Sequence, residues 1–264
     1  MRVTLLATLA APSLLAAAAL VAPIAANAAS LHALTADGKL VMIDSETRRS
    51  RPAVKITGAP GPVLSIALRP ADGKLYGLTA TQLVVIDPAT GRATPGATFD
   101  KPVETGPRAS VNFNPTVDRM RVVGMGGNNY RINVDTGAVT VDGTLKYGPA
   151  TPFATTAPRV TAAAYTNHMA GAKETMLMTI DTSLGQLNLQ APPNDGIQQP
   201  KKDLGTGLPN GVGFDILADA GTNTGYLLAN GRLTQVAMPG LETKELGAIT
   251  GLPTAEIISL AAAK

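Results

Sequence analysis

A pattern of short strands and polar turns recurs at intervals of roughly 50 residues along this chain, and such periodicity limits the fold more than any other feature. Each copy starts with a strand of small and apolar residues, passes through a polar turn and returns through a second strand. Four copies are readable: "SIALRPADGKLYGL" from Ser65, "SVNFNPTVDRMRVVG" from Ser110, "AAAYTNHMAGAKETMLMTI" from Ala162 and "GVGFDILADAGTNTGYLLA" from Gly211. Repeats of this kind bury their apolar faces against the next copy.

A third strand follows each pair, and its turn carries the Asp, Pro, Asn and Gly residues that favour tight connections. Examples are "QLVVIDPATG" from Gln82 and "NYRINVDTG" from Asn129. A weaker fourth strand comes next, as in "RATPGATF" from Arg92. Four short antiparallel strands at this period are typical of a β-propeller blade.

The two ends of the chain together supply a fifth blade. The segment "LHALTADGKLVMIDSETRRS" from Leu31 matches strands two to four of the repeat, and "EIISLAAAK" from Glu256 matches strand one. Placing Ile257–Ala262 beside Leu31–Leu34 completes the blade and leaves no open sheet edge. A β-sandwich would give no reason for this circularly permuted repeat. The sequence therefore predicts an all-β, five-bladed propeller with four short antiparallel strands per blade, closed by the C-terminal strand.

The N-terminal segment has the features of a secretory signal peptide. An apolar run rich in Ala and Leu follows Arg2, and Ala26-Asn27-Ala28 matches the small-x-small cleavage pattern. A membrane anchor is the alternative, but Pro12 and Pro23 interrupt the run and no charged stop-transfer segment follows. We expect a signal peptide over residues 1–28, one propeller domain over residues 29–264, a secreted or periplasmic location, and no membrane span after cleavage.

Several residue types are missing, and this limits the chemistry of the chain. It contains no Cys, no Trp and only 2 His, and its 22 basic residues nearly balance 19 acidic ones. Disulfides and thiolate metal sites are therefore impossible, and no basic face with interleaved aromatics indicates nucleic-acid binding. The glycine-rich "GMGGNN" from Gly124 joins two strands and does not open a helix, so it lacks the setting of a phosphate cradle. We expect no cofactor and no nucleic-acid partner.

Polar and charged residues are concentrated in the third blade, which includes the repeat copy from Ser110. A buried Arg needs hydrogen-bonded acceptors, so these residues could lock this blade to its neighbour. Alternatively, they could bind an anionic or polar ligand. The candidate ligand-binding residues are Asn112, Asn114, Arg121, Asn129, Arg131 and, from an inner strand two blades further on, Asp215.

One position of the repeat suits a side chain with an apolar body and a polar tip. It aligns Arg121 with His32, Tyr76, Leu177 and Tyr226. The two His residues, His32 and His168, fall in different blades, and we expect each to be a surface or interblade residue. No G-x-S-x-G motif is present. The sequence predicts no catalytic residue and no metal ligand.

The chain resembles a secreted bacterial family catalogued as domain of unknown function 4394. The most specific stretches are "FNPTVDRMRVV" from Phe113 and "RINVDTGAV" from Arg131, supported by "AAAYTNH" from Ala162 and "GFDI" from Gly213. The resemblance extends from about Leu31 to Ala262. Family members commonly have Asp where this chain has Asn112. The resemblance implies a propeller, and the family has no established activity to carry over.

Together these features favour a monomeric, extracytoplasmic propeller that binds a protein or a small polar ligand without catalysis. Loops on a rigid scaffold are a common place for such recognition. The alternative is a hydrolase or lyase with a divalent cation near the propeller axis, using Asp215 and the polar residues of the third blade. That chemistry needs several carboxylates on the inner strands, and Asp215 is the one carboxylate that the sequence places there.

Overall fold

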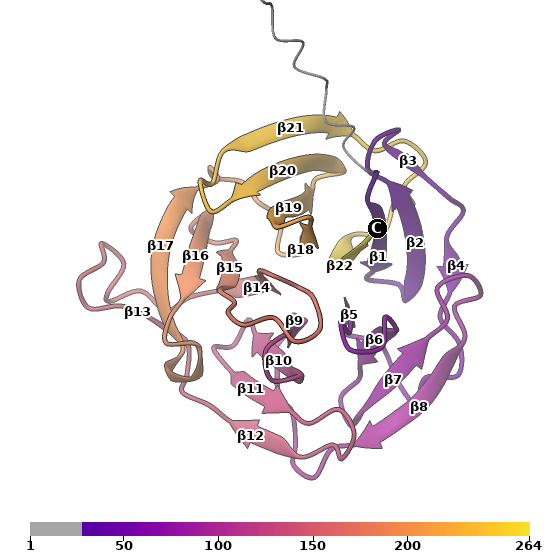
Figure 1. Ribbon diagram of the computed structural model, residues 1–264, viewed down its shortest axis with the longest axis horizontal. Coiled ribbons are helices and arrows are strands. Elements are labelled where there is room, and N and C mark those ends of the chain that lie inside the picture. The colour runs from indigo at the N-terminus through magenta and orange to yellow at the C-terminus, as the bar shows by residue number, and fades with distance from the viewer. Residues whose placement is uncertain (1–27) are drawn as a thin grey trace, which may run out of the picture.

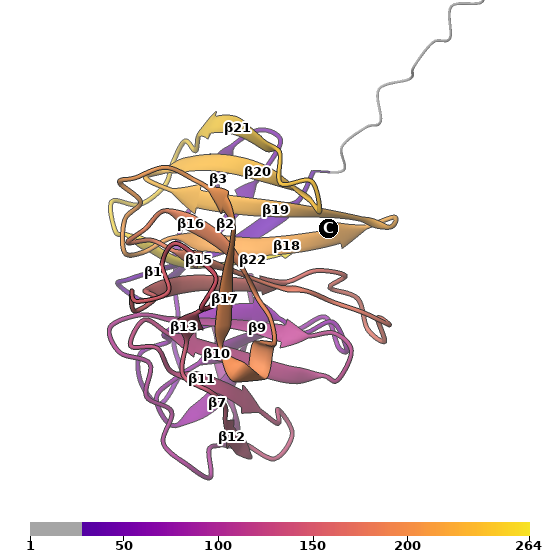
Figure 2. The ribbon, with the colours of Figure 1, turned by 90° about the vertical axis from the view of Figure 1, so that its left-hand side faces the viewer.

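The computed structural model describes residues 28–264, so the expected signal peptide lies outside the described residues except for Ala28. Five antiparallel sheets stand as blades around a central axis (Figure 1). Blade strands run between the two faces of the ring, and hairpin turns lie at both faces (Figure 2). No helix in this part of the chain is long and apolar enough to cross a membrane. The predicted all-β, five-bladed propeller is confirmed.

The blades are numbered 1 to 5 along the chain, and their strands are given from the axis outwards. Blade 1 contains β22 (Ile257–Ala263), β1 (Ser30–Thr35), β2 (Lys39–Asp44) and β3 (Arg49–Ser50). Blade 2 contains β5 (Ser65–Leu68), β6 (Leu75–Leu78), β7 (Gln82–Ile86) and β8 (Ala93–Thr98). Blade 3 contains β9 (Ala109–Asn114), β10 (Arg119–Gly124), β11 (Asn129–Ile132) and β12 (Val139–Val141).

Blades 4 and 5 complete the ring. Blade 4 contains β14 (Val160–Tyr165), β15 (Leu177–Asp181), β16 (Gln186–Gln190) and β17 (Ile197–Asp203), with the 3-10 turn η1 (Pro193–Asp195) before β17. Blade 5 contains β18 (Gly213–Asp219), β19 (Thr222–Ala229), β20 (Arg232–Met238) and β21 (Thr243–Ala248). Two sheets have a fifth short strand: β4 (Val54–Lys55) pairs with β2, and β13 (Lys146–Tyr147) pairs in parallel with β17.

The C-terminal strand closes the ring as predicted. Strand β22 pairs antiparallel with β1, with Leu31 opposite Ala262 and Leu34 opposite Ser259. The innermost strand of blade 1 thus comes from the far end of the chain, and its pairing uses the sheet edge that β1 would otherwise expose.

Polar side chains on the inner strands join adjacent blades near the axis. Inner strands of adjacent blades do not pair as a sheet, so buried backbone N–H groups on these edges need other acceptors. Hydroxyl, amide and carboxylate oxygens supply them at four of the blade junctions. The donor N–H and acceptor side chain are Ile66 and Ser259, Val111 and Ser65, Ala163 and Ser110, Tyr165 and Asn112, and Ala262 and Asp215.

In each blade, the residue equivalent to Arg121 lies on the second strand. Strand pairing places His32, Tyr76, Arg121, Met178 and Tyr226 opposite Ala261, Ala67, Asn112, Ala164 and Asp215. The alignment of Leu177 with this column was wrong by one residue. Leu177 lies opposite Tyr165, because the long connection between β14 and β15 hides the register of blade 4 in the sequence.

Candidate functional site

Arg121 is buried between blades 3 and 4 and is 1% exposed. Its Nε donates to Tyr165 Oη at 3.3 Å, and its Nη2 donates to Asn194 Oδ1 at 2.6 Å. Its Nη1 donates to Asn129 Oδ1 at 2.8 Å and to Asp142 Oδ2 at 2.5 Å. A guanidinium has five N–H donors, so the chain itself uses most of this group's hydrogen-bonding capacity.

Arg131 binds the same carboxylate from the neighbouring strand. Its Nε and Nη2 donate to the two oxygens of Asp142 at 2.8 and 2.9 Å. This contact raises the pKa of the Arg131 guanidinium. The side chain of Arg131 is 36% exposed, whereas that of Asp142 is 5% exposed. The network therefore has two cations on one carboxylate, and Arg131 is the cation that solvent reaches.

Asn129 extends this network into blade 4. Its Nδ2 donates to the backbone oxygens of Gly143 and Pro193, at 3.1 and 3.0 Å. Gln190 donates to the same Pro193 oxygen at 2.7 Å. The polar residues of blade 3 thus hold the η1 segment of blade 4 in place, as the interblade interpretation of the cluster predicted.

Asn112 and Asp215 meet near the axis. Asn112 Nδ2 donates to Asp215 Oδ1 at 2.9 Å, and that oxygen also accepts from the Ile216 N–H. Asp215 Oδ2 accepts from the Ala262 N–H at 2.8 Å. The side chain is fully buried, and burial raises the pKa of its carboxyl group.

The surroundings of Asp215 do not fit a divalent cation. Calcium and magnesium require several oxygen ligands, whereas N–H donors occupy both oxygens of this carboxylate. Within residues 28–264, no group of three or more His, Cys, Asp or Glu side chains could hold a metal ion. The cation expected under the alternative function therefore has no cluster of carboxylate or imidazole ligands among the described residues.

Five of the six candidate residues from the sequence are thus in contact through two adjoining clusters. Tyr165 connects the clusters, because its backbone N–H donates to Asn112 and its hydroxyl group accepts from Arg121. Asn114 stands apart: its Oδ1 accepts from the N–H and hydroxyl group of Thr116 within its own turn. The ligand-binding role of these six residues stays a prediction.

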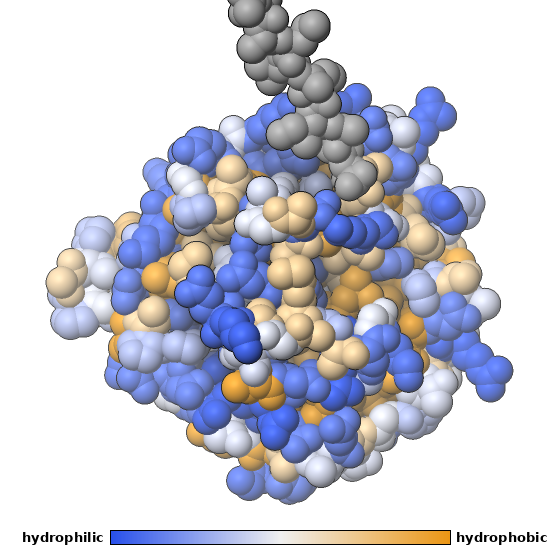
Figure 3. All heavy atoms as spheres, in the orientation of Figure 1, coloured by the Kyte–Doolittle hydropathy of each residue, from blue (hydrophilic) through white to orange (hydrophobic). Residues whose placement is uncertain are grey.

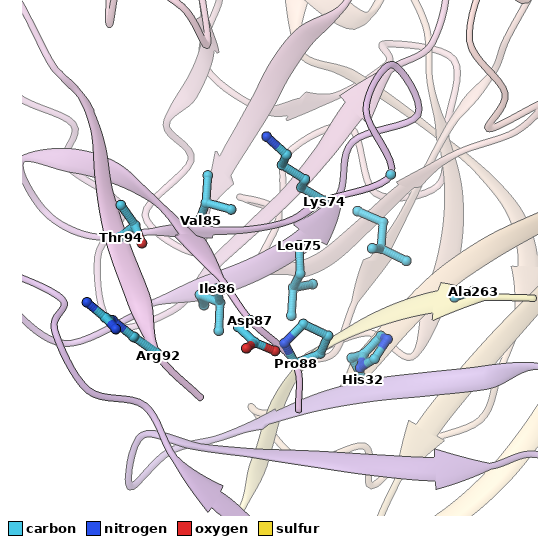
Figure 4. A pocket seen from close by; sticks show the side chains of 12 residues that line it. His32, Lys74, Leu75, Val85, Ile86, Asp87, Pro88, Arg92, Thr94 and Ala263 are labelled. Carbon is cyan, nitrogen blue, oxygen red and sulfur yellow. The ribbon is translucent and has the colours of Figure 1, made fainter. Parts of the chain in front are cut away.

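A hollow of about 620 Å³ lies between blades 1 and 2. We call it the interblade slot; its lining includes His32, Gly73, Lys74, Leu75, Arg92 and Ala263 (Figure 4). On the face seen in Figure 3, hydrophobic colour gathers right of centre, over the region where blades 1 and 2 meet in Figure 1. A volume of roughly 300–1,000 Å³ is usual for small-molecule sites.

His32 is the buried polar residue of the slot. The residue is 6% exposed, and its Nδ1 has no hydrogen-bond partner within residues 28–264. Burial lowers the pKa of the imidazole, so the ring is neutral at pH 7. A buried polar atom without a partner is uncommon in folded proteins and marks a place where a ligand or water can bind. The expected interblade position of His32 is confirmed, but the sequence did not single it out as a site.

Comparison with solved structures supports the fold through a match with a TM-score above 0.5. A protein of unknown function from Bacteroides thetaiotaomicron has a TM-score of 0.52 at 12% identity, covering 89% of this chain and 70% of that one. Another from Bacteroides caccae has a TM-score of 0.46 at 12% identity, covering 87% and 77%. An auxiliary nutrient binding protein from Bacteroides ovatus has a TM-score of 0.43 at 16% identity, covering 74% of this chain. The match spans only 55% of that last chain.

Identities this low show likeness of fold alone, and no match was found among curated proteins. The family model described as Domain of unknown function (DUF4394) matches residues 31–261. This range covers every blade and agrees with the motifs read from the sequence. The chain belongs to this family.

Proposed function

We propose that this protein is an extracytoplasmic, non-catalytic binding propeller that holds a small ligand in the interblade slot. The observation that carries the proposal is His32, which lines a hollow of about 620 Å³ and has a buried Nδ1 without a partner among the described residues. Elsewhere, partners from the chain itself occupy most of the N–H donors of Arg121 and both carboxylate oxygens of Asp215. A concave, mainly apolar hollow with a few polar groups is the usual form of a small-molecule site.

The extracytoplasmic location rests on the signal-peptide pattern of the N-terminal segment, which ends at Ala26-Asn27-Ala28. A Cys-free chain in such a compartment depends on packing and hydrogen bonds for stability. The closed ring and the side-chain bonds between inner strands provide both. We expect the propeller to act as a monomer.

The alternative, a hydrolase or lyase with a cation near the axis, has weaker support. It would rely on Asp215, whose oxygens already accept three N–H donors. A small ligand is also favoured over a protein partner, because the volume of the slot is in the range usual for small-molecule sites.

A thermal-shift screen tests the proposed function. The screen would use organic acids, amines, neutral sugars, short peptides and divalent cations on the mature chain. We expect at least one class of small organic compound to raise the melting temperature of the wild type and leave Ala263→Leu unshifted, because Ala263 lines the slot. Stabilisation by a divalent cation together with hydrolytic activity would favour the alternative. If no compound distinguishes the two proteins, the slot is not the binding site.

A further inference from the structure

We propose that the interblade slot selects a small organic anion, a carboxylate with an unbranched apolar body. This inference rests on the proposed function and adds the chemical class of the ligand. It follows from how the slot arises in the repeat, from the charge of its rim, and from the residues of its floor.

The neighbouring interface shows why the slot is open. Between blades 2 and 3, Arg69 donates to the two oxygens of Asp118 at 3.0 and 2.5 Å. The Arg69 guanidinium also lies 5.9 Å from the centre of the Tyr76 ring. The Arg69–Asp118 ion pair and the Tyr76 side chain therefore fill the space between blades 2 and 3.

The same positions between blades 1 and 2 carry much smaller groups. His32 lies opposite Ala261 in blade 1, and Tyr76 lies opposite Ala67 in blade 2, so the two pairs are equivalent. Ala263 stands two residues after Ala261, and Arg69 stands two residues after Ala67. Ala263 therefore corresponds to Arg69. Gly73 corresponds to Asp118, since each stands three residues before the second-strand position of its blade. Gly73 and Asp118 both have a positive φ, +68° and +49° respectively.

Ala263 and Gly73 both line the slot. The hollow therefore takes the place of an ion pair that the repeat forms one interface further on. A site that accommodates a guanidinium and a carboxylate elsewhere in the ring has room for a polar ligand group here.

The rim of the slot is positively charged. Lys74 and Arg92 line it and are exposed, and neither side chain forms an ion pair among the described residues. The one acidic residue of the lining is Asp87. Its oxygens accept from the N–H of Ala89 and the hydroxyl group of Thr90, at 2.9 Å each. An anion thus meets two cations without partners and one carboxylate occupied by its own turn.

The floor of the slot is apolar, and its residues come from blade 2. Leu75 and Ile86 are each 2% exposed, and Leu68, Val85 and Pro88 are half-buried around them. Figure 4 shows Leu75, Ile86 and Pro88 between His32 and the two basic residues of the rim. An alkyl chain covers such a surface, and each methylene buried there contributes to binding.

His32 completes the pattern. Its neutral ring accepts a hydrogen bond on one nitrogen and donates one from the other. Nδ1 is buried in this structure, so a donor or a carboxylate oxygen of a ligand satisfies it once the ring turns toward the slot. Tyr76 at the matching position already has a partner, because its hydroxyl group donates to Asp72 at 2.8 Å.

Calorimetric titration of the mature chain with octanoate tests the inference, with 1-octanol and octylamine as ligands of the same length but different charge. We expect octanoate to bind more tightly than either, and hexanoate to bind roughly tenfold more weakly than octanoate, because two methylenes are lost. Lys74→Ala and Arg92→Ala should each weaken octanoate binding roughly two- to fivefold. Lys244→Ala, an exposed lysine of blade 5 outside the slot, is the matched control and should leave it unchanged.

The double variant A263R/G73D reproduces the Arg69–Asp118 pair inside the slot and should abolish octanoate binding. Asp118 itself shows that an Asp can adopt the positive φ needed at position 73. A thermal melt checks that the variant folds, and Ala263→Leu replaces it if it does not. If octanoate still binds the variant whose slot is filled, the ligand binds elsewhere and the proposed site is wrong.

Comparing octanoate with 1-octanol and octylamine distinguishes failure of this inference from failure of the proposed function. If octylamine or octanol binds as tightly as octanoate and loses binding in A263R/G73D, the slot is a binding site but the anion class is wrong. If none of these ligands binds the wild type, the anion inference fails. A slot-dependent hit from another class in the thermal-shift screen would still support the proposed function.

Discussion

Arg121 and Asp142 form an ion pair of 2.5 Å whose side chains are 2% and 5% exposed. The pair joins β10 to the connection after β12, and Asn194 brings blade 4 into the same network. Charges at this depth persist because each has several hydrogen-bonded partners, and removing one partner leaves the others desolvated and unsatisfied. The third-blade cluster therefore has a measurable structural role.

Substituting Arg121→Ala should lower the free energy of unfolding by about 2–4 kcal/mol, because Asn129 and Asn194 lose a charged donor and Asp142 loses one of its two cations. For a domain of this size, the melting temperature should fall by about 5–15 °C. Arg119→Ala is the control, since Arg119 donates only to backbone oxygens of its own turn. An Arg121→Ala protein that melts with the wild type would instead support the ligand-binding role predicted for this residue.

Deleting residues 257–264 should expose the edge of β1 and make the protein aggregate or melt far below the full chain. The reason is that β22 supplies the whole inner strand of blade 1. Deleting Lys264 alone is the matched control. It removes an exposed ion pair with Asp219, which is worth little. A longer deletion that stayed soluble with an unchanged melting temperature would contradict closure of the ring by β22.

Ser65→Ala should destabilise the fold by about 1–3 kcal/mol, because Ser65 Oγ accepts the buried N–H of Val111 at 3.1 Å. The same hydroxyl group lies 3.0 Å from Ser259 Oγ of blade 1. Ser30→Ala, on β1 and without a side-chain hydrogen bond among the described residues, serves as the reference. Denaturant melts of the three proteins give the comparison; equal midpoints would show that these axial bonds contribute no stability.

The pH dependence of stability should carry a contribution from His32. Burial lowers the pKa of His32 from its usual 6.5. As the pH falls through 6.5, the unfolded chain gains a proton that the folded chain does not, so stability falls on acidification. The melting temperature of the wild type should therefore drop more between pH 7.5 and 5.5 than that of His32→Phe. Both proteins retain His168, so equal drops would show that His32 titrates normally when folded.

Much of this structure is readable from the sequence, and the failures have physical causes. The sequence repeat predicted the blades, because every blade has the same pattern of strand and turn residues. The segment "EIISLAAAK" predicted the closing strand. The register of blade 4 was misplaced by one residue at Leu177, because an irregular connection separates β14 from β15. Asp142 and Asn194 were missed because they lie in connections, one after β12 and the other in η1, and the strand pattern does not fix the position of such residues.

The interblade slot was missed for a different reason. It depends on side chains that are small, Ala263 and Gly73, at positions where the next interface has Arg69 and Asp118. Polar residues accumulate at the candidate site predicted from the sequence, whereas the slot arises where an ion pair of the repeat is missing. Aligning the turns and the strand ends as well as the strands would have revealed it.

Ligand binding at His32 can be measured directly, because the chain has only 2 His and the other, His168, does not line the slot. The measurement is an imidazole ¹⁵N–¹H correlation spectrum of the mature protein during titration with octanoate. We expect the His32 ring signals to shift progressively and saturate while those of His168 stay in place, and we expect A263R/G73D to abolish the His32 shift. Unmoved His32 signals at saturating octanoate, or equal shifts of both rings, would contradict binding at His32.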